Sequence, residues 1–139
     1  MRAITMSQMG LMDFIMDAKS RIKEVDVDMA EKLLAKDYKL LDVREPAEHN
    51  HIAIADSINV PRGVLEPAAD LNYPNANPDL RDNRDAKWLV LCATGGRAAL
   101  ATDTLQKMGF ADVTNISGGM TAWIDSGKPT ISPIDNPYV

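Results

Sequence analysis

The sequence predicts an α/β fold in which a central, mainly parallel sheet of five strands carries helices on both faces. Two observations support this prediction. Short apolar runs alternate along the chain with segments whose apolar residues recur at helical spacing, which is typical of parallel strands joined by crossover helices. One run, residues 87–91 (KWLVL), is apolar after its first residue, as expected for a strand covered on both faces.

Length, charge and cysteine content limit the possible functions. A chain of 139 residues with 45% apolar content suits one compact domain. A net charge of −5 and a pI near 4.9 argue against nucleic-acid and anionic-membrane partners, because both need a basic surface. One cysteine and two histidines are too few for an internal disulfide or a structural zinc site, so we expect no metal and no cofactor. A single free thiol also favours a reducing compartment.

Residues 1–23 are expected to form an amphipathic helical extension. Apolar side chains recur at roughly helical spacing between residues 7 and 22, at Met9, Met12, Ile15, Met16, Ala18 and Ile22. Asp13 and Asp17 interrupt the pattern that a signal peptide would need, and no apolar stretch reaches the roughly 20 residues of a membrane span, so a cytoplasmic protein is predicted. The helix could pack on the outside of the domain or provide a Met-rich partner surface, in a monomer or a homodimer.

The first half of the domain is expected to contain three strands. Residues 24–27 form a short strand, and Asp28 caps a helix that continues to about residue 36. Residues 39–43 form a buried strand that ends in a charged corner, where Pro46 suits the first turn of a short helix. Residues 57–60 form the third strand, which the next proline ends.

The second half is expected to contain two further strands and their helices. Residues 66–85 are rich in Pro, Asn and Asp, and predict a long irregular segment with at most one helical turn. The strand at 87–91 is followed by a helix over about 97–108, which Gly109 ends. The remaining elements are a fifth strand and a last helix, at 112–116 and 120–126.

Cys92 is the candidate catalytic residue, because it stands at the carboxyl end of the clearest strand, the edge at which open α/β sheets bind ligands. The loop that follows, Ala93-Thr94-Gly95-Gly96, contains paired glycines that let successive backbone N–H groups point inward as an anion-binding nest. Arg97 and the amino end of the helix that it begins both favour a thiolate over a thiol. The predicted substrate-binding segment is therefore the loop 93–97.

The spacing around Cys92 narrows the chemistry. A lone cysteine is more often a small core residue than a nucleophile, but the combination of strand, cysteine, glycine-rich turn, arginine and helix favours the nucleophile. Cysteine phosphatases place five residues between cysteine and arginine, whereas this loop has four, and Leu91 stands where many of them carry a histidine. A phosphoryl group therefore fits poorly, and a single sulfur atom is the better cargo.

Four further charged residues near strand ends are candidates for the site. Asp42 and Arg44 form a charged corner and are expected to pair with each other or with Glu48, as structural support for a turn. Arg62 follows another strand at its carboxyl end and could contact an anionic donor. The two histidines are spaced like solvent-facing residues around a short helix, so no metal site is predicted there.

The sequence resembles the rhodanese family from about Glu24 to Gly127. Separated motifs carry the resemblance: LDVREPAE at 41–48, INVPRG at 58–63, the loop CATGGR at 92–97 and VTNISGGMTAW at 113–123. The resemblance implies a rhodanese-like three-layer sandwich over residues 24–130, between the extension at 1–23 and a C-terminal tail at 131–139.

The resemblance also implies a sulfurtransferase reaction of the thiosulfate sulfurtransferase type. Cys92 would take a sulfane sulfur from a small anionic donor such as thiosulfate, hold it as a persulfide against the N–H groups of 93–97, and pass it to a thiol or cyanide. The acceptor, such as a protein thiol, must come from outside, because the chain has no second cysteine. Ala93 and Ala98 stand where many active members carry a basic residue and a hydroxyl, which makes the site less electropositive. A non-catalytic binding or sulfur-sensing module is the alternative.

Overall fold

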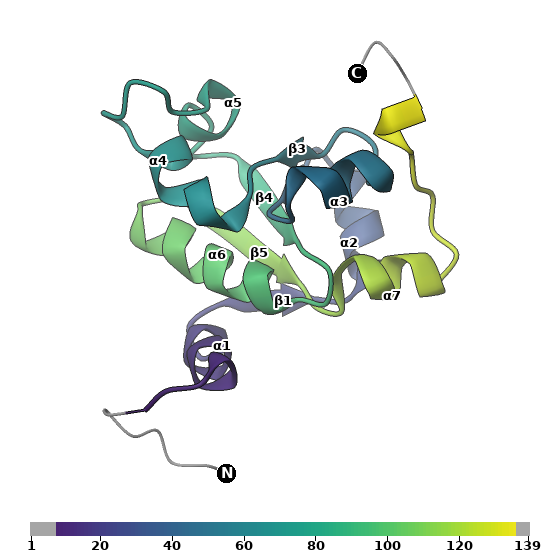
Figure 1. The fold of residues 1–139 in the computed structure, drawn as a ribbon, viewed down its shortest axis with the longest axis horizontal. Coiled ribbons are helices and arrows are strands. Elements are labelled where there is room, and N and C mark those ends of the chain that lie inside the picture. The colour runs from purple at the N-terminus through teal and green to yellow at the C-terminus, as the bar shows by residue number, and fades with distance from the viewer. Residues whose placement is uncertain (1–7, 136–139) are drawn as a thin grey trace.

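The computed structural model describes residues 8–135 and confirms the predicted α/β fold (Figure 1). Five strands form one sheet in the order β1-β5-β4-β2-β3, and each neighbouring pair is parallel. The strands are β1 Lys23–Val25, β2 Lys39–Asp42, β3 Ile58–Asn59, β4 Lys87–Leu91 and β5 Asp112–Ile116. Because β4 is central, its carboxyl end is flanked by the carboxyl ends of β2 and β5.

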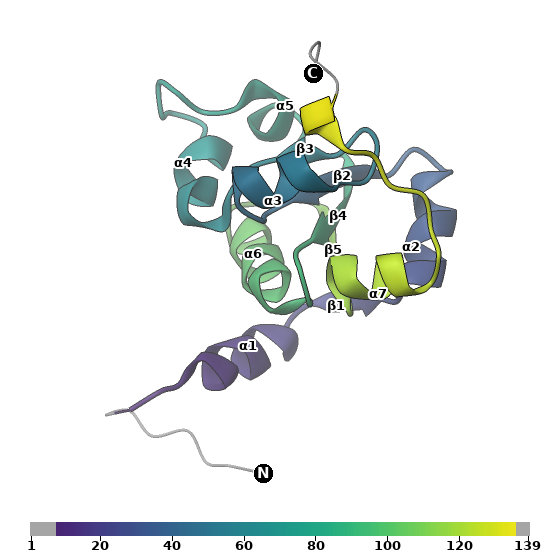
Figure 2. The same cartoon turned by 45° about the vertical axis from the view of Figure 1, so that its right-hand side comes forward.

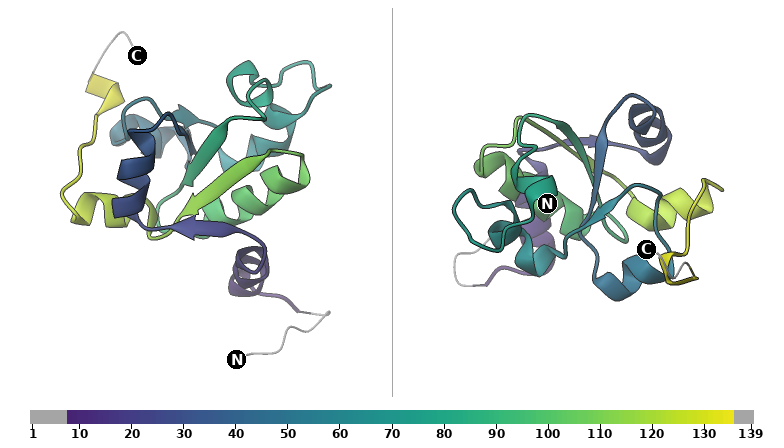
Figure 3. Two further views of the ribbon diagram at one scale, coloured as in Figure 1. Left: turned by 180° about the vertical axis from the view of Figure 1, so that it is seen from behind. Right: turned by 90° about the horizontal axis from the view of Figure 1, so that it is seen from above.

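Helices cover both faces of the sheet. They are α1 Leu11–Lys19, α2 Val27–Leu34, α3 Pro46–His51, α4 Leu65–Ala69, α5 Pro78–Arg81, α6 Gly96–Lys107 and α7 Gly119–Asp125, with 3-10 turns at Arg62–Val64 and Pro133–Asp135. α4 and α6 lie on one face, whereas α2 and α7 lie on the other (Figures 1 and 2). Seen from above, the strands run between these two helical layers (Figure 3). This arrangement is the predicted three-layer sandwich.

Side-chain alternation along β4 decides which way the candidate cysteine points. Trp88 and Val90 face the α6 side of the sheet, where they belong to one buried cluster. Leu89 and Leu91 belong to a second cluster on the α2 and α7 side. Because successive side chains of a strand point to opposite faces, Cys92 continues the first series and joins the cluster on the α6 side.

The helix after β1 begins earlier than the sequence predicts. Its cap is Asp26 rather than Asp28, since the Asp26 side chain accepts a hydrogen bond of 2.9 Å from the Met29 N–H. Asp28 lies in the first turn and pairs with Lys128 at 2.8 Å. Aspartate is favoured both as a cap and in the first helical turn, so sequence pattern alone did not separate the two positions.

The segment at 66–85 is more helical than predicted, because it contains most of α4 and all of α5. Leu65 and Ala69 are fully buried one turn apart, and this burial stabilises α4, whose Pro67 lies in the first turn, where its missing N–H costs little. Asn77 caps α5 by accepting a hydrogen bond of 2.9 Å from the N–H two residues later. α4 forms because distant parts of the chain bury its apolar side chains, and composition does not reveal this burial.

The N-terminal helix packs against α6 on the outside of the domain. α1 is shorter than the predicted helix at 7–22, and Ser7 lies outside the described residues. Arg21, just beyond α1, donates hydrogen bonds of 3.0 and 2.8 Å to the carboxylate of Asp103 in α6. Within residues 8–135, no helix has the length and apolar character needed to cross a membrane.

The C-terminal segment is joined to the domain where the predicted tail begins. Ile131 and Ala53 exchange two backbone hydrogen bonds, at 2.8 and 2.9 Å. The divisions at 23 and 130 stay predictions, and both flanking segments contact the domain.

Candidate active site

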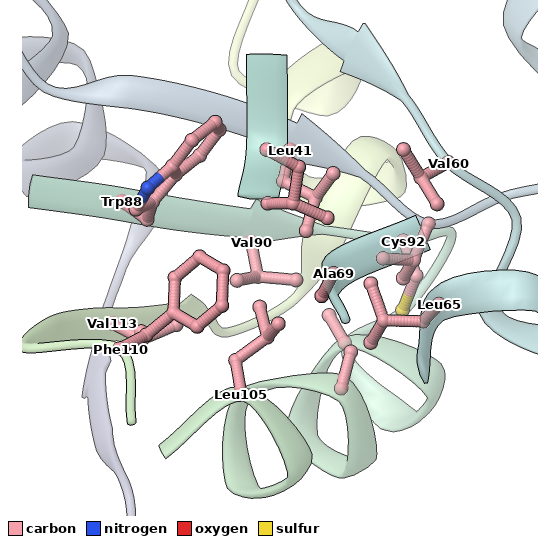
Figure 4. Packing of buried hydrophobic residues seen from close by; sticks show 14 residues of the cluster. Leu41, Val60, Leu65, Ala69, Trp88, Val90, Cys92, Leu105, Phe110 and Val113 are labelled. Atoms are coloured by element: carbon pink, nitrogen blue, oxygen red, sulfur yellow. The ribbon is translucent and has the colours of Figure 1, made fainter. Parts of the chain in front are cut away.

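Cys92 lies one residue beyond β4, at the carboxyl edge of the sheet. It is only 1% exposed and belongs to the same buried cluster as Val60 and Leu65 (Figure 4). The edge position follows from the strand that the sequence predicts, but the apolar cover comes from the segment after β3, which sequence reasoning did not connect to the site. The sulfur is therefore nearly inaccessible to solvent in this structure.

The loop after Cys92 brings a backbone N–H to the sulfur. Gly95 has a φ of +107°, a left-handed conformation that glycine adopts at little cost, and it caps the amino end of α6. In this conformation its N–H donates a hydrogen bond of 3.0 Å to Cys92 Sγ. This N–H and the positive end of the α6 dipole both stabilise negative charge on the sulfur.

The side of the loop that faces α7, called its rear, is held by the backbone of the first turn of α7. The Met120 N–H donates to the Cys92 carbonyl at 2.8 Å, and the Thr121 N–H donates to the Ala93 carbonyl at 3.0 Å. Gly119 approaches so closely that a Cβ on it would lie 2.5 Å from the Cys92 carbonyl oxygen. Because a trans peptide directs its N–H opposite to its C=O, the next two loop N–H groups point away from α7.

The front of the loop carries an ion pair between Arg97 and Glu48 of α3. Arg97 donates two hydrogen bonds, of 2.8 and 3.1 Å, one to each carboxylate oxygen of Glu48. Hydrogen bonding from Arg97, helped by the Glu45 N–H, lowers the pKa of Glu48 from 4.5 to about 2. The same hydrogen bonds raise the pKa of Arg97. From the sequence, Arg97 is expected to favour the thiolate and Glu48 to support the corner after β2, whereas the structure joins the two residues.

The charged corner after β2 is held by a separate, buried ion pair. Arg44 donates to the Asp42 carboxylate from Nε and Nη2, at 3.1 and 2.8 Å, and the two side chains are 4% and 0% exposed. Arg44 also donates to the Ile52 carbonyl at 2.7 Å. The Asn59 amide donates to the carbonyls of Asp42 and Arg44, at 3.0 and 2.9 Å. These charges are therefore paired within the corner.

The structure places the Arg62 guanidinium beside the middle of α6. It donates to Glu66 at 2.9 Å and to Thr104 at 3.3 Å. Thr104 lies two helical turns beyond Arg97, about 10 Å along the helix axis at 1.5 Å per residue. A contact between Arg62 and a donor at Cys92 stays a prediction.

Other polar features lie away from Cys92. His49 is half-buried rather than solvent-facing, with its Nε2 3.0 Å from Ser57 Oγ. Across residues 8–135, no group of three or more His, Cys, Asp or Glu side chains is arranged to hold a metal ion. A cavity of about 460 Å³ is lined by residues that include Lys39 and Ile58, which begin β2 and β3. It therefore lies at the amino edge of the sheet, opposite the cysteine.

Sequence reasoning missed two contacts of the loop. One is the close approach of Gly119, for which the paired glycines directly after β5 were the available signal. The other comes from α1, since a Cβ on Gly96 would lie 2.9 Å from Ile15 Cδ1. The N-terminal helix therefore touches the start of α6 at the cysteine loop, and no local pattern indicates this contact.

Known relatives can be aligned with this sequence over most of its length. A family model described as a rhodanese-like domain matches residues 26–126. Thiosulfate sulfurtransferase 16 of Arabidopsis thaliana, described as chloroplastic, is 34% identical over 125 residues, which cover 83% of this chain and 98% of the relative. A sulfurtransferase function is therefore supported at the level of the family.

Solved structures share the fold. A protein of unknown function from Rhodopseudomonas palustris, described as a possible tyrosine phosphatase, matches with a TM-score of 0.79 and 33% identity over 92% of this chain and 98% of that one. The polysulfide-sulfur transferase homodimer of Wolinella succinogenes matches with a TM-score of 0.65 and 30% identity over 84% and 83%. The family model, the relative and these folds agree, and the chain belongs to the rhodanese family.

Proposed function

We propose that this chain is a rhodanese-type sulfurtransferase that carries a sulfane sulfur on Cys92 as a persulfide. The observation that supports the proposal most is the Gly95 N–H, which lies 3.0 Å from Cys92 Sγ at the amino end of α6. A persulfide carries its charge one bond farther out than a thiolate. The loop N–H groups that point away from α7 would bind that outer sulfur, as an oxyanion hole binds a developing charge.

The reaction has two half-reactions. With thiosulfate as donor, a bond forms between Cys92 Sγ and the outer sulfur, the S–S bond of thiosulfate breaks, and sulfite leaves with the electron pair. An external thiol or cyanide then attacks the outer sulfur of the persulfide and releases the Cys92 thiolate. The acceptor is external because the chain contains no second cysteine that could displace the sulfur as a disulfide.

The other predicted site residues support this reaction in different ways. Residues 93–97 supply backbone donors, and the pairing of Glu48 with Arg97 holds the front of the loop. Asp42 and Arg44 fix the corner next to the carboxyl end of β4, to which it is bonded through the Val43 N–H and the Leu91 carbonyl at 2.9 Å. Arg62, which pairs with Glu66, would contact an anionic donor.

Intact mass spectrometry tests the proposal. The reduced protein is incubated with excess thiosulfate or, in parallel, inorganic polysulfide, freed of donor and compared with Cys92→Ser. We expect the wild type alone to gain one sulfur atom, and cyanide to remove that atom as thiocyanate. No gain from either donor, in a folded and fully reduced protein, would contradict the proposal.

A non-catalytic sulfur-binding or sensing module is the second candidate, and the burial of Cys92 favours it. The two functions differ in turnover. An enzyme releases thiocyanate continuously when donor and cyanide are both in excess, whereas a sensor retains one sulfur per chain after loading.

Phosphatase activity, suggested by the description of the Rhodopseudomonas protein, is not part of the proposal. The loop has four residues between Cys92 and Arg97, and Arg97 is already bound to Glu48. A cytoplasmic location and a monomeric or homodimeric state stay predictions. The homodimer belongs to the Wolinella protein, and the Arabidopsis relative is described as chloroplastic.

A further inference from the structure

Arginines near the carboxyl edge of the sheet are already paired with carboxylates. Arg44 follows β2 and pairs with Asp42 at 2.8 Å. Arg62 follows β3 and pairs with its own carboxylate, Glu66, at 2.9 Å. Arg97, the cation of the cysteine loop itself, is bound through both Nη atoms to Glu48. The four residues between Cys92 and Arg97 carry no charge, so the loop presents backbone N–H groups and no unpaired cation to a donor.

The sulfur itself lies in apolar surroundings. Cys92 is 1% exposed and shares its cluster with Ala98. Val60 and Leu65 of the same cluster lie beside it (Figure 4). A dianion that reaches this sulfur loses hydration, and only an unpaired cation or several hydrogen bonds would offset that cost. The Glu48 carboxylate, about one-third exposed, leaves the front of the loop without net positive charge.

We infer that the site selects donors whose sulfane sulfur is carried by an uncharged organic group, namely alkyl persulfides, over dianionic donors, and that Glu48 sets this preference by neutralising Arg97. The inference rests on the proposed sulfur transfer through Cys92 and names its donor class. Glu48 does not touch the sulfur. It determines specificity through Arg97, by removing the positive charge that a dianion would need.

The transfer from an alkyl persulfide balances without any oxidant or reductant. Cys92 thiolate attacks the outer sulfur of R–S–SH, a new bond forms between Cys92 Sγ and that sulfur, and the S–S bond of the donor breaks. The R–S⁻ thiolate leaves with the electron pair, and the proton stays on the transferred sulfur or passes to R–S⁻. The leaving group carries one charge instead of the two on sulfite, so less charge has to be stabilised within the apolar cover.

Two organic persulfides that differ in charge test the donor class in the wild-type protein. N-acetylcysteamine persulfide has an uncharged organic part, whereas mercaptosuccinate persulfide carries two carboxylates. Single-turnover loading of Cys92 is followed by rapid-quench mass spectrometry, and each rate is divided by the rate of the same donor with free N-acetylcysteine. We expect the normalised rate of the uncharged donor to exceed that of the dicarboxylate by about tenfold or more.

Variants of the ion pair test the role of Glu48. Glu48→Gln releases the charge of Arg97 and should narrow the ratio of the two normalised rates to within about threefold, whereas Arg97→Gln leaves Glu48 unpaired and should widen it. Glu31→Gln is the matched control, because it removes the same charge from α2, where Lys128 retains its partner Asp28. It should leave the ratio unchanged.

The outcomes separate this inference from the proposed function. Equal normalised rates for the two donors in the wild type would overturn the donor class. Formation of the Cys92 persulfide in the same experiment would still support the proposed sulfur transfer. Loading from neither donor, nor from thiosulfate or polysulfide, would overturn both. If Glu48→Gln and Arg97→Gln each leave the ratio unchanged, Glu48 does not set the preference. The wild-type ratio decides the donor class even where a variant fails to fold.

Discussion

The rear and the front of the cysteine loop are stabilised by different kinds of atoms. At the rear, backbone N–H groups of α7 bind the carbonyls of Cys92 and Ala93, and Gly119 leaves no room for a side chain. At the front, the contact is made by two side chains, Glu48 and Arg97, which are about one-third exposed. The rear therefore fixes the positions of the loop atoms, whereas the front, under the inference drawn above, sets the charge that a donor meets.

This difference teaches where the site tolerates change. A backbone-to-backbone contact has no side chain that can move aside, so a substitution at the rear shifts the carbonyls themselves. An ion pair that is about one-third exposed is screened by water, and its loss alters electrostatics with little change in packing. Variation in donor preference is therefore expected at the front, and loss of the fold of the loop is expected from changes at the rear.

The largest effect is expected from Gly119→Ala at the rear. Gly119 has a φ of +58°, and the new Cβ would lie 2.5 Å from the Cys92 oxygen and 2.7 Å from the Ala93 oxygen. Strain and overpacking each cost about 1–3 kcal/mol, so we expect the free energy of unfolding to fall by about 4 kcal/mol in urea denaturation.

Gly127→Ala is the control for that experiment. Gly127 also has a positive φ, of +73°, but a Cβ there meets nothing within 4 Å. The free energy of unfolding of this variant should fall only by the cost of the left-handed conformation, about 1 kcal/mol. Equal losses in the two variants would show that the close approach behind the loop contributes nothing.

The next largest effect is expected at the buried corner, from Asp42→Asn. The change leaves the Arg44 charge 4% exposed with its carboxylate partner neutral, and breaking a buried pair of this kind costs about 3 kcal/mol or more. Urea denaturation at neutral pH measures the loss. If the free energy of unfolding falls by no more than it would for an exposed pair, water reaches Arg44. The corner would then not differ in burial from the Glu48–Arg97 pair at the front of the loop.

The same distinction explains which features of the site the sequence predicts and which it does not. The strand at 87–91 and the position of Cys92 follow from local apolar pattern, because that run contains its own signal. The partner of Arg97 does not, since Glu45, Glu48 and Asp42 all lie within the same charged stretch and only the packing of α3 selects Glu48. Contacts between distant segments, such as α1 with Gly96, have no local signature.

A smaller effect is expected from Ile15→Ala, which weakens the contact of α1 with the loop. Ile15 is buried and its Cδ1 faces Gly96. The lost packing should cost about 2 kcal/mol, mostly as local release of α1. Hydrogen exchange should therefore accelerate in α1 more than in β4.

Phe14→Ala, at a half-exposed position of the same helix, should change stability by less than about 0.5 kcal/mol. Unchanged exchange in Ile15→Ala would show that the Ile15 contact does not hold α1 against the domain.

The smallest effect is expected at the front, in the pH dependence of the Glu48–Arg97 pair. Arg97 lowers the pKa of Glu48 from 4.5 to about 2, so the folded state binds this proton less readily than the unfolded chain. The stabilisation is therefore complete above pH 4.5 and is lost as the pH falls toward about 2. Because both side chains are about one-third exposed, the stabilisation by this pair should stay below about 1 kcal/mol.

Urea denaturation of the wild type and of Glu48→Gln, between neutral pH and about pH 3, measures the difference between their free energies of unfolding. That difference should shrink on acidification, and a difference that grows would mean that Glu48 is destabilising in its charged form.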